Sequence, residues 1–133
     1  MKINTCLRQK IQAFINTCLR RICNIRWPRK ITNVELWQKT RESPIEVEIR
    51  KQKWRWIGHT LRKPNTTIIR QAIQWNPQGK RKRGRPRSTW RRDTLAEMER
   101  RGYGWKQLER DALNRSKWKT VVGGLCSQVD PKA

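Results

Sequence analysis

Apolar residues in the first part of the chain recur at the spacing of a helix. From Ile11 to Ile22 they fall at intervals of three and four residues, and the same stripe extends toward the N-terminus. That spacing places them on one face of an amphipathic helix. The helix should end before Trp27-Pro28, because a residue that precedes proline is driven out of the α region.

Two capping boxes mark the next helix starts. Thr32-x-x-Glu35 should open a short helix, and Ser43-Pro-Ile-Glu46 a longer one in which proline takes the tolerated first position. Residues 45–49 also alternate like a strand. The cap and the length of the pattern favour a helix, which should end at Lys63-Pro64.

The remaining periodic segments predict three more helices. Residues 65–67 can cap one that runs out at Trp75-Asn-Pro77, and Ser88 or Thr89 caps another that is closed by residues 102–104. The last follows one apolar stripe over residues 105–122. The pattern therefore predicts an all-α fold of about six short amphipathic helices in a small, loose bundle.

Between these segments, residues 78–87 hold no apolar side chain and are rich in Lys and Arg. Such a run is typical of a linker or an unfolded arm. We expect an N-terminal helical segment over residues 1–76, a basic linker with Gly and Pro over residues 77–88, a C-terminal helical segment over residues 89–126, and a disordered tail over residues 127–133.

Composition decides how firmly these helices should fold. About one residue in five is Ile, Leu, Val or Phe, and the net charge is +23, which borders on the composition of disordered chains. Eight tryptophans offset this shortage, because each indole can bury roughly 150–250 Å². We expect the helices to fold, but against strong charge repulsion.

Several protein classes conflict with the sequence. No apolar run approaches the roughly 20 residues of a membrane span, and the N-terminus lacks the apolar stretch of a signal peptide, so we expect an intracellular protein, nuclear or cytoplasmic. The four cysteines form no C-x-x-C pair and lie far from His59, the single histidine. We expect reduced, structural thiols, with no metal and no cofactor.

Positive charge is concentrated in two tracts. Residues 1–34 hold eight Lys and Arg and residues 49–92 hold fifteen, and neither tract contains an acid. Uncompensated tracts fit nucleic-acid phosphates; a solvated helix face would normally mix both signs, and an anionic membrane surface is a further alternative. The candidate phosphate-binding residues are Arg50, Lys51, Lys53, Arg55, Lys80, Arg81, Lys82, Arg83, Arg85, Arg87, Arg91 and Arg92.

Within the second tract, Arg83-Gly84-Arg85-Pro86 resembles the core of an AT-hook. In that motif glycine lets the backbone approach the floor of a narrow minor groove while the arginines enter its negative potential. Unspecific phosphate binding and a nuclear-import role for residues 80–83 are the alternatives. Trp54 and Trp56 are candidates for stacking on unpaired bases, although an indole at helical spacing is more often part of a core.

The residues needed for catalysis are not apparent. Two-metal phosphoryl transfer needs gathered carboxylates, and the acids here are scattered without an Asp-Asp pair. His59 has no obvious nucleophile beside it, and the glycines match neither a phosphate loop nor a dinucleotide-binding motif. We expect the chain alone not to be an enzyme and to have no small-molecule substrate.

Motifs along nearly the whole chain, from about Lys10 to Leu125, carry a family resemblance. They include Trp54-Arg-Trp-Ile-Gly-His59, the block Gly79-Lys-Arg-Lys-Arg-Gly-Arg-Pro86 and Thr89-Trp-Arg-Arg92. In this order they resemble the region downstream of the polymerase domain in the reverse transcriptases of non-LTR retrotransposons.

The resemblance implies contact with template or target nucleic acid, RNA or DNA, and an upstream polymerase domain as partner in a full-length parent. The family's polymerase motif, Tyr-x-Asp-Asp, has no counterpart here, since Tyr103 is followed by Gly104. The sequence thus looks like a non-catalytic C-terminal fragment or a truncated genomic copy. The alternative is a free-standing basic RNA-binding structural protein, such as a ribosomal component.

Overall fold

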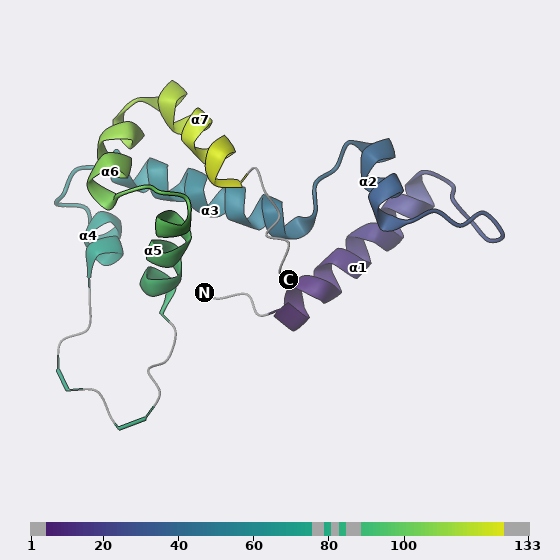
Figure 1. The fold of residues 1–133 in the computed structure, drawn as a ribbon, viewed down its shortest axis with the longest axis horizontal. Helices are drawn as coiled ribbons and strands as arrows, with labels where there is room; N and C mark the ends of the chain where they lie inside the picture. The colour runs from purple at the N-terminus through teal and green to yellow at the C-terminus, as the bar shows by residue number, and fades with distance from the viewer. Residues whose placement is uncertain (1–4, 76–78, 81–82, 85–88, 127–133) are drawn as a thin grey trace. The chain divides into compact units, whose positions relative to one another are not determined.

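The computed structural model describes residues 5–75, 79–80, 83–84 and 89–126. The described residues form helices joined by loops and contain no strand, which confirms the all-α prediction (Figure 1). None of these helices is both long and apolar enough to cross a membrane. The helices are α1 (Thr5–Ile22), α2 (Asn33–Thr40), α3 (Ile45–Leu61), α4 (Ile68–Gln74), α5 (Trp90–Arg100), α6 (Trp105–Leu113) and α7 (Arg115–Cys126).

The chain forms two compact units, Met1–Arg50 (unit 1) and Lys51–Ala133 (unit 2), with the division inside α3. Residues 51–75 and 89–126 therefore belong to the same unit. They lie on either side of residues 77–88, the basic segment. Of the expected linker, only residues 79–80 and 83–84 are described. The expected tail over residues 127–133 lies outside the described residues.

The structure describes seven helices where the sequence pattern predicted about six. The difference arises at Asn114, which interrupts the single C-terminal helix that was expected. Its backbone ends α6 with φ −95° and ψ 112°, and its side-chain oxygen accepts a hydrogen bond from the Lys117 N–H at 3.1 Å. Asparagine competes in this way with the helical backbone, so one residue ends α6 and caps α7.

Local signals placed most of the other helix ends correctly. The Thr32 capping box is complete, with the Thr32 hydroxyl and the Glu35 carboxylate each accepting the other's backbone N–H. Thr89 caps α5 through its side chain, whereas Thr67 occupies the N-cap of α4 without a side-chain hydrogen bond. α5 ends at Arg100, and Gly102 follows with a left-handed φ of 72° that favours glycine.

α1 ends at Ile22, several residues before the expected stop at Trp27-Pro28. Asn24 adopts a left-handed φ of 52°. The Asn24 N–H then bonds to the Arg21 carbonyl and the Ile25 N–H to the Arg20 carbonyl. This is the hydrogen-bond pattern of a Schellman motif, and asparagine is the usual substitute for glycine at its left-handed position.

Unit 1 is joined largely by polar contacts. The buried Asn16 of α1 accepts hydrogen bonds from Gln12 at 3.0 Å and from the Trp37 indole of α2 at 2.8 Å. Gln12 also accepts the N–H of Ile45 at the start of α3, at 2.7 Å. The predicted apolar stripe of α1 is only partly covered, and Phe14 is 70% exposed.

Unit 2 contains a tryptophan core built on α3. Trp54, Ile57 and Leu61 share one face of that helix and are almost fully buried. The Trp118 indole of α7 lies 6.4 Å from the Trp54 ring, between centroids, and donates a hydrogen bond to the Trp54 backbone carbonyl at 3.1 Å. A Cβ atom at Gly58 would overlap the Trp118 ring, so glycine is what admits this close approach.

Candidate nucleic-acid interface

Five of the sequence-predicted phosphate-binding residues are exposed in unit 2. Arg55 lies on α3, Lys80 and Arg83 lie in the basic segment, and Arg91 and Arg92 occupy the first turn of α5. The N-terminal end of a helix dipole is positive and does not stabilise cations in the first turn. Arg91 and Arg92 therefore add to the positive potential at the start of α5, which Asp93 in the same turn offsets in part.

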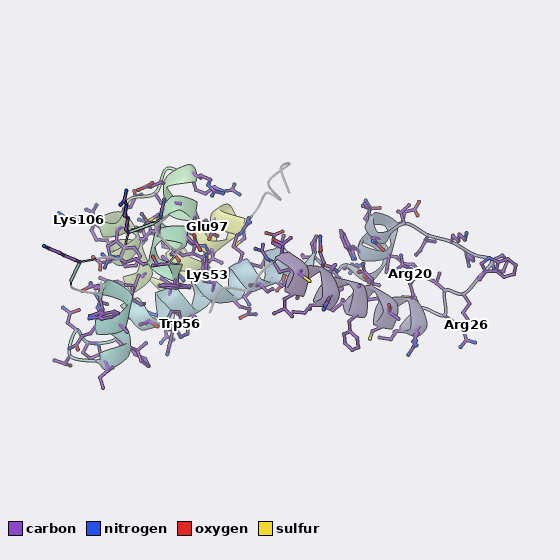
Figure 2. The ribbon with its side chains drawn as sticks, turned by 90° about the horizontal axis from the view of Figure 1, so that it is seen from below. Arg20, Arg26, Lys53, Trp56, Glu97 and Lys106 are labelled. Atoms are coloured by element: carbon purple, nitrogen blue, oxygen red, sulfur yellow. The ribbon has the colours of Figure 1, made fainter. Side chains whose placement is uncertain are left out.

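Three other predicted residues are partly covered and involved in contacts. Arg50 lies 3.8 Å from Glu46, one turn earlier in α3. Lys53 pairs with Glu97 of α5 (Figure 2) and lies 5.3 Å from the centre of the Trp54 ring. Lys51 is half-buried and has a partner. These cations contribute to packing, and the exposed five are better placed to meet phosphates.

Trp54 is not available for base stacking, which corrects the sequence prediction. The residue has no exposed surface, and its indole N–H donates to Glu97 at 2.9 Å. Trp56 remains a candidate because it is 47% exposed. It meets the Trp90 ring edge to face, with centroids 6.0 Å apart.

Four predicted residues, Arg81, Lys82, Arg85 and Arg87, lie outside the described residues. The structure does describe Gly84, at the centre of the AT-hook-like sequence. Its φ is 132°, a conformation that side chains rarely adopt, and a Cβ there would meet nothing within 4 Å. Glycine is thus required at this position for backbone conformation and not for space within the protein.

A cleft in unit 2 contains residues that the sequence analysis did not assign to a site. Its volume is about 180 Å³. α4, α5 and α6 supply its walls, through Ile73, Gln74, Trp90, Arg91, Thr94, Leu95 and Trp105. The sequence pattern predicts position 105 only as the start of an apolar stripe, and Trp90 only as part of the Thr89-Trp-Arg-Arg92 motif. The one available signal is that Trp90 lies two residues after the basic segment.

Glu109 of α6 holds two residues of this cleft in place. One of its carboxylate oxygens accepts the Trp105 indole N–H at 3.0 Å and the Gln74 amide at 3.2 Å. Arg70 lies 4.0 Å from the same oxygen. The charge of Glu109 is therefore directed toward groups of its own unit.

Two other carboxylates of unit 2 also contact groups of their own unit. Glu97 binds Lys53 and the Trp54 indole, and the buried Asp111 lies 2.7 Å from Lys117. Among the described residues, no three His, Cys, Asp or Glu side chains gather as metal ligands would. Glu97, Glu109 and Asp111 are thus engaged in contacts within unit 2, while Lys80, Arg83, Arg91 and Arg92 are exposed.

No protein-family model, curated protein or solved structure matches the chain.

Proposed function

We propose that the chain is a non-catalytic nucleic-acid-binding region that contacts the phosphates of RNA or DNA through unit 2. One observation carries the proposal: exposed cations lie within the basic segment, at Lys80 and Arg83, and in the first turn of α5 that follows it, at Arg91 and Arg92. Each phosphate that they neutralise would release condensed counterions, which favours binding at low salt.

The two sequence blocks have different structural roles, which supports the proposal. Trp54, Ile57 and Gly58 of the Trp-x-Trp-Ile-Gly-His block form or admit the core of unit 2. The Gly- and Arg-rich block instead supplies exposed charge at Lys80 and Arg83. A rigid helical body that carries a flanking set of cations suits a surface that follows a phosphate backbone.

The proposed origin follows from the sequence resemblance alone. The chain would correspond to the region after the polymerase domain of a non-LTR retrotransposon reverse transcriptase. Its partner would be that upstream domain, and polymerase chemistry would belong to the missing part. The sequence supports a non-catalytic role because its acids are scattered and lack the Asp-Asp pair of the polymerase motif.

Salt dependence tests the binding proposal. The full chain is titrated against a labelled mixed-sequence duplex and a labelled single strand, with fluorescence anisotropy as the readout. The logarithm of the binding constant should fall linearly with the logarithm of salt concentration, by roughly 0.9 for each duplex phosphate contacted. Absence of binding at low salt, or an affinity that salt does not change, would contradict the proposal.

Comparing binding to A·T-rich and mixed-sequence duplexes distinguishes phosphate binding from minor-groove reading. Gly84→Val keeps every charge but obstructs close approach to a groove floor. It also disfavours the φ of 132° at this position, an effect that should change binding to both duplexes alike. We expect similar, small losses on A·T-rich and mixed-sequence duplexes, as phosphate binding requires. A large loss confined to A·T-rich duplex would assign the segment to the minor groove.

A further inference from the structure

We infer that the cleft between α4, α5 and α6 receives a single unpaired nucleobase of an RNA or DNA strand whose phosphates are held by the neighbouring cations. The inference rests on the proposed function, because it adds base stacking to phosphate binding by the same unit. It assigns the stacking role to Trp90 and Trp105, in place of the buried Trp54.

The size and lining of the cleft fit a flat aromatic group. A cavity of about 150 Å³ accommodates benzene, and this cleft measures about 180 Å³. Two indoles, Trp90 and Trp105, contribute to its walls together with the apolar Ile73 and Leu95. Indole faces stack on bases of any sequence, because every base has a π surface.

Hydrogen bonds hold the cleft in its present form. Glu109 fixes the Trp105 indole and the Gln74 amide, and Arg91 donates to the Gln74 backbone carbonyl. The Arg91 contact joins the first turn of α5 to the last residue of α4. A preformed wall of this kind costs less ordering when a ligand enters.

The position of the cleft identifies a nucleic-acid base as its occupant. The basic segment leaves α4 after Gln74 and enters α5 at Trp90, and both residues line the cleft. Phosphates drawn to Arg91 and Arg92, in the same helical turn as Trp90, would keep an unpaired base of the same strand near these indoles. Arg91 itself has five N–H donors, of which the Gln74 carbonyl uses one.

The test compares strands with and without bases. The full chain is titrated with oligothymidylate, with oligouridylate, and with an abasic strand of the same length and charge. We expect the base-containing strands to bind about tenfold more tightly than the abasic one, as stacking by one base provides. A preference between thymidylate and uridylate distinguishes DNA from RNA as the source of the base.

Leu95→Phe should fill the cleft and abolish this difference while leaving the affinity for the abasic strand unchanged. Leu113→Phe is the matched control, because Leu113 lies on α6 outside the cleft and is 70% exposed. It should keep the tenfold difference. If Leu95→Phe fails to fold, NMR of the unmodified chain replaces it: oligothymidylate should shift the indole N–H signals of Trp90 and Trp105 but not those of Trp54 and Trp118.

Equal binding of abasic and base-containing strands would overturn the cleft assignment while phosphate binding stands. Loss of the difference in both phenylalanine variants, or indole shifts confined to other tryptophans, would overturn it as well. Failure of every strand to bind would contradict the proposed function itself.

Discussion

The two units of the chain are stabilised in different ways. Among the described residues, unit 1 buries two apolar side chains, Leu36 and Val47, whereas unit 2 buries twelve. Unit 1 relies instead on hydrogen bonds around Asn16 and on the pair between Arg8 and Glu46. The comparison shows how a chain with few aliphatic residues folds: it concentrates its buried aliphatic side chains, together with Trp54 and Trp118, in one unit.

Basic side chains also have different roles in the two units. In unit 1, Arg8 and Arg50 both approach Glu46, and Arg20 donates to Asn33 at 2.6 Å. These cations help to position helices and a loop. In unit 2 the positive charge next to the basic segment is exposed, while the core is formed by apolar side chains. The unit with the better core thus carries the proposed binding surface.

The largest expected effect is on the core of unit 2. Gly58→Ala places a methyl group inside the Trp118 ring position, and overpacking of this kind should lower the free energy of unfolding by about 3 kcal/mol. Chemical denaturation followed by circular dichroism measures the loss. Gly123→Ala, at a helical glycine with nothing within 4 Å, should instead stabilise by up to about 1 kcal/mol. Equal effects of the two changes would show that the Trp118 contact does not hold unit 2 together.

A smaller effect is expected in unit 1. Asn16→Ala removes the acceptor of the Gln12 and Trp37 hydrogen bonds, which should cost about 1–2 kcal/mol because partly buried donors lose their partner. Native-state hydrogen exchange should show faster opening of α1 and α2 and unchanged protection of α7. Thr17→Ala, on the exposed side of α1, is the control and should change protection little. Equal acceleration in both units would contradict their separate stabilisation.

The smallest effect concerns pH at the start of α2. The backbone N–H and hydroxyl of Thr32 lower the pKa of Glu35 below its ordinary value of 4.5. A carboxylate with a lowered folded pKa stabilises the fold above that ordinary value, and this contribution is lost as pH falls through the lowered pKa. The protection factors of the α2 amides, which correct for the pH dependence of intrinsic exchange, should therefore fall on acidification. Glu35→Gln keeps a capping-box side chain without the titration, so the same fall in this variant would exclude Glu35 as the cause.

Local signals in the sequence were sufficient to predict most helix ends. Thr32, Thr89 and Gly102 act through their own side chains or backbone, so their neighbours along the chain determine the outcome. Asn114 was missed because it lies within a continuous apolar stripe, where its alternative hydrogen bond to Lys117 is not visible. The exposure of Phe14 was missed because periodicity identifies a helix face without showing what covers it.

The candidate site was predicted only in part for a similar reason. On a helix, Trp54 and Trp56 point about 200° apart, so one must face inward, and spacing to Ile57 and Leu61 selects Trp54. The sequence contains that signal. The cleft contains residues from three helices, and its assembly depends on tertiary packing that one sequence does not specify.

The central claim is that unit 2 carries the nucleic-acid-binding surface. It is tested most directly by neutralising three cations in unit 2 in one variant and three cations in unit 1 in another. Lys80, Arg83 and Arg92 are changed together to Gln in one variant, and Arg21, Arg26 and Arg29 in another; all six side chains are exposed. Binding to a mixed-sequence duplex is measured over a salt series. The slope of the logarithm of the binding constant against the logarithm of salt concentration should become shallower by roughly 2–3 in the unit 2 variant. In the unit 1 variant it should become shallower by less than about 1. Equal losses, or a greater loss from unit 1, would contradict the account.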